Sequence, residues 1–234
     1  MELYNIEKHY RQAITNIWEK YKHLPVLDKP GCEYRKSPLA PASIKRNVLL
    51  FVGINPSYGK GAINNEIEPE IAFYTLDTHR DNDIPYFKQF KKLAEHCNTE
   101  WDHLDLLFIR ETNQKVIEDL TYDTEGIRFI EEQLKISFEI LKNLEPKAIV
   151  VANAFASEFF GKKKDKHAKL EKIWQGYSFD FNTDFDSEIG TYTIPLNGKR
   201  VPIFFSGMLS GQRALDLGSL ERLMWGVKRV IRTN

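Results

Sequence analysis

The sequence predicts an α/β fold, a three-layer α/β/α sandwich around a central four-stranded, mainly parallel sheet with an appended hairpin. Four short apolar runs are bounded by turn residues, which is typical of strands buried on both faces. Amphipathic helical stretches separate the runs, and strands that alternate with helices predict a parallel sheet covered on both faces. The 234 residues are 42% hydrophobic, which is enough for the core of one domain.

The first 46 residues are predicted to form a helix and an irregular connector. The apolar residues of the helix share one face at helical spacing, and they are Ile6, Tyr10, Ile14, Ile17 and Tyr21. The stretch from Leu24 to Arg46 carries four prolines and no clear period, so we expect it to wrap over the surface. We expect a single domain over residues 1–234, with its α/β core in residues 47–234.

The core strands and helices follow from the apolar pattern. The four predicted strands are residues 48–52, 104–109, 148–152 and 201–205. Apolar stripes at helical spacing precede the third strand, over residues 127–141, and follow the fourth, over residues 220–230. Alternating patterns at residues 177–181 and 191–194 predict the hairpin that is appended to the sheet.

Composition and charge exclude several classes of protein. No stretch reaches the ~18 apolar residues of a membrane helix, and no secretion signal is visible at the start, so we expect a cytoplasmic protein without a membrane partner. Two cysteines, Cys32 and Cys97, are too few for a disulfide framework or a four-cysteine metal site. The net charge of zero counts against a nucleic-acid binder. The basic run at residues 162–169 is read as a solvated loop, with a DNA contact as the alternative.

Polar residues follow each of the four predicted strands. They lie in four loops, at residues 55–58, 110–113, 153–155 and 206–213. Because the carboxyl ends of parallel strands meet at one edge of a sheet, we expect these loops to form a common cleft.

The first loop carries a recognisable motif. Gly53, Ile54, Asn55, Pro56 and Ser57 resemble the first motif of the uracil-DNA glycosylase superfamily, in its mismatch-directed and single-strand-selective branches. There the order is Gly, an apolar residue, Asn, Pro and a small residue. Short motifs recur by chance, and a simple stop between a strand and a loop is the alternative.

The last loop resembles a second motif of the same superfamily, but only in part. Leu209, Ser210 and Arg213 match a pattern in which His-Pro-Ser continues to Pro-Leu-Ser and an Arg. The His is missing, and its place is taken by Phe205, or by Ser206 if the register slips by one residue. The resemblance spans residues 48–231 in strand order and loop placement.

The resemblance implies a DNA glycosylase-like protein, which flips uracil or another modified base out of DNA and hydrolyses its N-glycosidic bond. It implies no metal or organic cofactor, DNA as the partner and a monomer. The candidate catalytic residues are Asn55, which orients the attacking water, and Ser206. Candidate substrate-binding residues are Gly53, Ile54, Pro56, Ser57, Tyr58, Tyr74, Phe87, Asn113 and Asn153. Candidate DNA-binding residues are Gly207, Met208, Leu209, Ser210, Gln212 and Arg213.

Some roles stay open at this point. Tyr58 is the first choice for stacking on the base because it is nearest to Asn55 in sequence, and Phe73, Tyr74, Tyr86 and Phe87 are further candidates. No clear amide reads the uracil edge; Asp105 and Asn113 are the nearest polar residues. Met208 and Leu209 either fill the hole left by the flipped base or pack under the last helix.

Two other functions compete with the glycosylase. Loss of the His removes a donor to the departing base, and the loss of one such donor costs about 10²–10³ in rate. The chain is therefore alternatively a weak or inactive nucleic-acid-binding member of the same fold. A small-molecule or nucleotide enzyme of Rossmann-like type is the other alternative, and it agrees better with the neutral charge.

Overall fold

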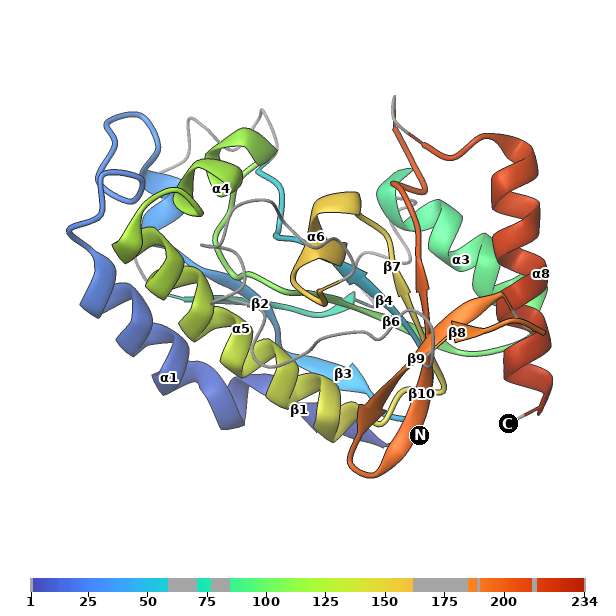
Figure 1. Cartoon of the computed structure of the whole chain (residues 1–234). Helices are drawn as coiled ribbons and strands as arrows, with labels where there is room; N and C mark the ends of the chain where they lie inside the picture. Colours follow the sequence, from blue (N-terminus) through green and yellow to red (C-terminus); the bar gives the residue numbers. More distant parts are fainter. Residues whose placement is uncertain are drawn as a thin grey trace.

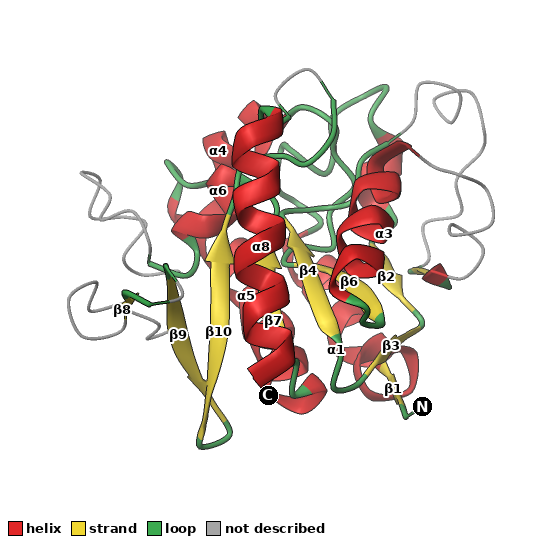
Figure 2. Cartoon of the chain, turned by 90° about the vertical axis from the view of Figure 1, so that its right-hand side faces the viewer, coloured by secondary structure: helices red, strands yellow, loops and turns green. Residues whose placement is uncertain are grey.

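The computed structural model describes residues 2–58, 71–76, 85–161, 185–188, 190–211 and 214–233. They form a mixed α/β fold in which helices lie on both faces of a central sheet (Figures 1 and 2). The helices are α1 (Ile6–Tyr21), the 3₁₀ helix η1 (Glu33–Lys36), α3 (Pro85–Cys97), α4 (Gln114–Leu120), α5 (Thr124–Leu144), α6 (Ala154–Glu158) and α8 (Leu217–Thr233). The strands are β1 (Leu3–Asn5), β2 (Leu39–Pro41), β3 (Ser43–Lys45), β4 (Leu49–Gly53), β5 (Ala72–Tyr74), β6 (Trp101–Asp105), β7 (Ala148–Val151), β8 (Phe185–Asp186), β9 (Thr191–Leu196) and β10 (Lys199–Phe205).

The central sheet has six strands in the order β6-β4-β7-β10-β9-β8. Neighbours from β6 to β10 pair in parallel, whereas β9 is antiparallel to both β10 and β8. The prediction of a mainly parallel sheet is thus met in part: β6, β4, β7 and β10 form four parallel strands, and β9 and β8 extend the sheet to six. The strand predicted at residues 191–194 is β9, and it pairs directly with β10 through a tight turn at Asn197 and Gly198, which both adopt a positive φ.

The second predicted strand, at residues 104–109, is displaced in the structure to Trp101–Asp105. Its polar residues are tolerated in the sheet because Asp102 accepts hydrogen bonds from the amides of Lys45 and His103, both at 2.8 Å. The apolar residues after Asp105 form a buried loop instead, where Gln133 and Ser137 of α5 bond to the main chain of Phe108 and Leu106. The carboxyl end of β6 is therefore Asp105.

Alternate residues of β4 face opposite sides of the sheet. Leu50 and Val52 belong to the core that α1 and α5 complete, whereas Leu49 and Phe51 pack with α3 and α8. The predicted stripe of α1 is buried, as are the stripe residues of α5. Each helix begins at a side-chain cap, Asn5 for α1 and Asp123 for α5.

The connector is more regular than the sequence predicts. It contains η1, β2 and β3, and β2 pairs in parallel with β5 while β3 pairs antiparallel with β1. Leu24, Leu27, Ala40 and Ile44 belong to the core, so the prediction of a segment wrapped over the surface is wrong for them. The connector can form these strands despite its prolines, because β2 and β3 are each three residues long and lie outside the central sheet.

Several predictions fall on residues that the structure does not describe. These are the strand at residues 177–181, the basic run at residues 162–169, and the side chains of Gln212 and Arg213. Within the described residues, no helix is both long and apolar enough to span a membrane.

Candidate functional site

A cavity of about 470 Å³ opens at the carboxyl ends of β4, β6 and β7. It is lined by Leu39, Ile54, Asn55, Pro56, Ser57, Tyr74, Tyr86, Phe87, His103, Asp105, Glu111, Thr112, Gln114, Ala152, Asn153 and Met208. In the sheet, β6 lies on one side of β4, whereas β7, which comes later in the chain, lies on its other side. The strand order therefore reverses at β4. Open α/β sheets bind ligands at such a switch point. The cavity therefore lies where the fold favours a site, and each of the four predicted loops contributes at least one residue to its lining.

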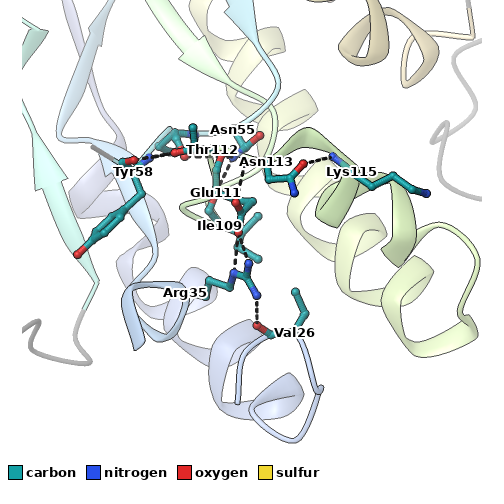
Figure 3. A network of polar contacts seen from close by, with 10 residues as sticks. Val26, Arg35, Asn55, Tyr58, Ile109, Glu111, Thr112, Asn113 and Lys115 are labelled. Atoms are coloured by element: carbon teal, nitrogen blue, oxygen red, sulfur yellow. Dashed lines mark hydrogen bonds and ion pairs between the residues drawn. The ribbon is translucent and has the colours of Figure 1, made fainter. Parts of the chain in front are cut away.

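Asn55 is held in one orientation by its own loop and the loop after β6 (Figure 3). Its Nδ2 donates to the main-chain oxygens of Pro56, Ile109 and Glu111, at 3.0, 3.2 and 2.6 Å. Three carbonyl oxygens can only accept, so the side-chain nitrogen must face them and Oδ1 must point the other way. Asn55 thus offers a hydrogen-bond acceptor to the cavity, with its direction set by the backbone.

Glu111 ties this loop to the connector (Figure 3). Its amide donates to the Pro56 oxygen at 2.9 Å, and its Oε1 accepts from the Asn113 amide at 2.7 Å. Its Oε2 forms an ion pair with Arg35, whose Nε lies at 2.7 Å, and both side chains are almost fully buried. Arg35 also donates to the Val26 oxygen at 3.2 Å. A buried, fully hydrogen-bonded ion pair of this kind fixes geometry more than it adds stability.

Tyr58 does not line the cavity, contrary to the prediction. Its ring is buried and stacks on Tyr34, with ring centroids 3.9 Å apart (Figure 3 shows the ring extending away from Asn55). Its main chain exchanges two hydrogen bonds with the Thr112 hydroxyl, at 2.9 and 2.7 Å. Tyr58 therefore anchors the end of the loop rather than forming a stacking surface in the cavity.

Aromatic rings from other elements supply that surface. Tyr74 of β5 and Tyr86 and Phe87 of α3 line the cavity, and the rings of Tyr86 and Phe87 meet edge to face at 5.0 Å. Tyr74 and Phe87 were predicted to bind substrate, and the structure brings them together with Asn55. Met208, from the last loop, adds a flexible apolar side chain to the same wall.

Asp105 lies on the floor of the cavity against Gly53. The two residues are register partners in β6 and β4, and a methyl carbon placed on Gly53 would lie 2.1 Å from Asp105 Oδ1. Glycine is therefore required at position 53 because the carboxyl group passes over its Cα. His103 Nε2 is 3.6 Å from the same carboxyl oxygen.

Burial raises the pKa of Asp105 to about 8. Burial also raises the pKa of Tyr74 and of Tyr86, and the nearby Asp105 raises both further. At neutral pH the carboxyl group is therefore mainly protonated, with one O–H donor beside one carbonyl acceptor. The sequence analysis offers Asp105 only beside Asn113, as one of the two nearest polar residues for reading the uracil edge, because the predicted strand begins three residues too late and its end at Asp105 is missed.

The two other asparagines serve as helix caps. Asn153 lines the cavity, but its Oδ1 accepts from the amides of Phe155 and Ala156 at 2.8 and 3.0 Å, at the start of α6. Asn113 lies outside the cavity lining, and its Oδ1 accepts from the Lys115 amide at 3.1 Å, at the start of α4. Asn113 is thus explained by capping alone, and Asn153 can offer only its amide nitrogen to a ligand.

The last loop contributes less to the cavity than predicted. Ser206 is buried outside the lining, its amide continues the pairing to the Val151 oxygen at 2.9 Å, and its hydroxyl donates to the Gly207 oxygen at 2.8 Å. The prediction of a catalytic Ser206 is therefore not supported by its position. Leu209 is buried in the core below α8, which favours packing over the role of a wedge. Among the predicted DNA-binding residues, Met208 alone lines the described part of the cavity.

A second cavity, of about 700 Å³, lies between α1 and the connector. Its walls carry exposed ionic side chains such as Lys36, which pairs with Asp28 at 2.9 Å. None of the residues that follow the core strands lines it, so we place the candidate site at the smaller cavity.

No protein-family model and no curated protein matches the sequence. Within the described residues, no group of three histidine, cysteine or acidic side chains is placed to hold a metal ion. The functional assignment therefore depends on the cavity and on the motif resemblance at the first loop.

Proposed function

We propose that the chain hydrolyses the N-glycosidic bond of uracil or another modified base in DNA, after the base has been flipped into the cavity at the end of β4. The observation that carries the proposal is the orientation of Asn55. Its nitrogen is bound by three main-chain oxygens, which leaves Oδ1 as a fixed acceptor on the cavity wall. The motif around Asn55 supports the same function by resemblance.

In the proposed reaction, a water molecule donates a hydrogen bond to Asn55 Oδ1. An amide takes up no proton near neutral pH, so Asn55 orients the water without acting as a base. The water oxygen bonds to the sugar C1′ as the bond from C1′ to the base nitrogen breaks, and the bonding electron pair leaves with the base. One proton of the water ends on the base, and the products are the free base and an abasic sugar.

The rest of the lining suits a flipped base. Tyr74, Tyr86 and Phe87 offer ring surface, and stacking on such rings offsets part of the free energy that a base loses when it leaves the DNA stack. Met208 lies on the same wall and belongs to the turn that we assign to DNA contact. In this proposal the chain acts as a monomer in the cytoplasm, where DNA is accessible to it.

Strand cleavage at the abasic product tests the proposal. Single-stranded and mispaired uracil oligonucleotides are incubated with the protein and then treated with alkali. We expect scission with the wild type and a loss of about 10²–10³ in rate for Asn55→Ala. Asn16→Ala is the matched control, because Asn16 is an exposed asparagine of α1 that receives a hydrogen bond from Gln12 at 2.8 Å.

Other outcomes identify the competing functions. Salt-sensitive binding of the oligonucleotides without scission, at excess protein, indicates a nucleic-acid-binding protein. Full activity of Asn55→Ala removes Asn55 from the mechanism.

A nucleotide or small-molecule enzyme is the second candidate. The position of the cavity at the strand-order reversal and the net charge of zero favour it, since such cavities commonly hold small ligands. Mass spectrometry of the ligand released from purified, denatured protein separates the two. A bound nucleotide in stoichiometric amount favours this second function over the first.

A further inference from the structure

We propose that the outer surface of α3 and α8 binds single-stranded nucleic acid, with phosphates held by basic side chains and one base stacked on Trp225. The basic side chains of this surface, the α3–α8 face, are Lys88, Lys91, Lys92, Arg222, Lys228, Arg229 and Arg232. None of them lines the cavity at the end of β4, so the inference does not rest on the reaction proposed there. It assigns a binding surface that is separate from the candidate site.

The two helices form one continuous surface. They lie side by side on the same side of the central sheet (Figure 2). The Cys97 thiol at the end of α3 donates to the main-chain oxygen of Met224 in α8, at 3.8 Å. Burial raises the pKa of this thiol to about 11, and the nearby Lys228 and Arg232 act in the opposite direction. The cations of α8 therefore lie beside the end of α3, and the basic residues of both helices act together.

Charge is unevenly distributed over the two sides of the sheet. The helices of the α3–α8 face carry seven basic residues against two acidic ones, Glu95 and Glu221. On the other side of the sheet, α5 carries three basic residues against four acidic ones. A chain with a net charge of zero thus presents one positive face, and a polyanion is attracted to that face in particular.

The cations on the two sides also differ in their partners. On α5, Arg128 pairs with Glu125 at 2.8 Å and Lys135 with Glu131 at 3.1 Å. Five cations of the α3–α8 face form no ion pair with any described residue, namely Lys91, Lys92, Arg222, Lys228 and Arg232. A phosphate that binds to them releases counterions without breaking an internal ion pair. The attraction of the face for phosphates is therefore not offset within the protein.

Trp225 places aromatic surface among these cations. It is 55% exposed, and the guanidinium carbon of Arg229 lies 5.4 Å from its ring centroid. Beside it lies a cavity of about 640 Å³, whose lining includes Arg222 of α8, Phe185 of β8 and Tyr192 of β9. The ring centroids of Phe185 and Tyr192 are 5.0 Å apart. Basic side chains combined with aromatic rings are the arrangement that holds single strands, because the rings stack on unpaired bases.

The orientation of α8 distinguishes this ligand from a duplex and from a membrane. A base inside a duplex is stacked on its neighbours and does not reach a ring on the outside of a helix, so Trp225 favours an unpaired base. A helix that lies on a membrane turns its apolar side toward the lipid. The apolar side of α8 is turned toward the sheet instead, since Leu220, Val227 and Val230 are buried.

The first experiment measures the phosphate contacts. A fluorescent oligothymidylate of fifteen nucleotides, which contains no uracil, is titrated with the protein at several salt concentrations, and binding is followed by anisotropy. The triple variant changes Arg222, Lys228 and Arg232 to Gln. We expect weaker binding and a slope of log K against log salt that is smaller by about 2, because each lost contact with a single strand contributes about 0.7. An unchanged slope overturns the inference.

A second triple variant is the matched control for net charge. It changes Arg128, Lys135 and Lys142 of α5 to Gln, which removes the same charge from one helix on the other side of the sheet. We expect it to bind the strand as the wild type does. An equal loss in both triple variants would show that only the total charge matters, and it would overturn the assignment to the α3–α8 face.

Trp225→Ala tests the stacking. We expect the affinity for the single strand to fall about 5–150-fold with an unchanged salt slope, because a stacked base is lost and no phosphate contact is. Leu217→Ala is the control, since it removes an exposed apolar side chain from the same helix. We expect it to bind normally. Unchanged affinity in Trp225→Ala, or an equal loss in Leu217→Ala, contradicts the role of Trp225.

Two further ligands identify the source of the phosphates. DNA and RNA strands of the same length share the chemistry that the face recognises, so binding of either supports the inference and the tighter one identifies the source. Binding to vesicles of anionic lipid, with binding to neither strand, overturns it. None of these measurements needs base release. Binding without any strand scission of uracil oligonucleotides refutes the proposed function alone, whereas scission with unchanged binding in the first triple variant refutes this inference alone.

Discussion

The main-chain oxygen of Glu111 lies 2.6 Å from Asn55 Nδ2, while the Glu111 side chain is bound by Arg35 of the connector. One residue thus joins the first motif, the loop after β6 and η1 (Figure 3). In the proposed reaction Asn55 orients a water through its side-chain amide, so Arg35 in the connector, by holding Glu111, helps to fix the geometry of the candidate site.

Loss of the Arg35 charge is expected to destabilise the protein. Arg35→Met leaves the Glu111 carboxylate buried without its partner, and breaking a buried pair costs about 3–5 kcal/mol. Lys36→Met removes an exposed pair with Asp28 in the same 3₁₀ helix, and the expected cost is about 0–1 kcal/mol. Unfolding in urea measures the change in unfolding free energy for both variants. Equal effects of the two variants would contradict a structural role for the buried pair.

A methyl group at position 53 is expected to displace Asp105. Gly53→Ala places a carbon 2.1 Å from Asp105 Oδ1, so the carboxyl group or the strand must move, at a cost of about 1–3 kcal/mol. Shortening the neighbour should relieve the clash. The double variant Gly53→Ala with Asp105→Ala is therefore expected to be more stable than the sum of the single effects. Additive changes in unfolding free energy show that the two positions do not interact.

The stability of the protein is expected to fall with rising pH because of Asp105. Its pKa is about 8 in the folded protein and about 3.9 in unfolded chains. Between these two pKa values the folded state binds more protons than the unfolded state. The free energy of unfolding therefore falls by about 1.4 kcal/mol for each pH unit from about pH 4 to about pH 8. Asp105→Asn lacks this loss. We expect the free energy of unfolding of Asp105→Asn, relative to that of the wild type, to be higher at pH 8 than at pH 4. The same difference at both pH values would exclude a raised pKa of Asp105.

The caps at Asn113 and Asn153 separate stability from ligand binding. Each side chain accepts from the first turn of its helix, so alanine at either position is expected to cost about 1 kcal/mol. Only Asn153 lines the cavity. Under the proposed function we therefore expect Asn153→Ala to weaken the binding of uracil in the cavity as well, and Asn113→Ala to leave that binding unchanged. A loss of binding in Asn113→Ala would show that stability, and not the cavity contact, governs the effect.

The strongest sequence patterns gave the correct elements. The apolar run before Gly53 is β4, and the stripes of α1 and α5 are buried as their spacing predicts. Burial on both faces leaves such a run few alternatives. The second strand was misplaced because the apolar residues after Asp105 look like a strand, whereas the strand itself contains Asp102 and His103. Their polar groups are satisfied by contacts from distant segments, which a local pattern does not contain.

The residues of the candidate site were also predicted only in part. Asn55, Asn153 and Met208 meet at one cavity because the order of parallel strands brings their ends together. Tyr74 of β5 and Phe87 of α3 reach the same cavity from outside the central sheet. Tyr58 was chosen by its nearness in sequence, but its ring stacks on Tyr34 of the connector. Nearness along a loop says where a backbone goes and not where a side chain points, since that depends on its packing partners.

Local information in the chain is sufficient for the α/β class, the buried first strand and the polar loops that follow the strands, because periodicity and turn residues act over a few positions. The orientation of the Asn55 amide, the neutral state of Asp105 and the need for Gly53 come from groups that the fold alone places side by side. Hydrogen bonding and desolvation depend on distance in space, so these properties arise when the loop after β6 and the connector close around the carboxyl end of β4.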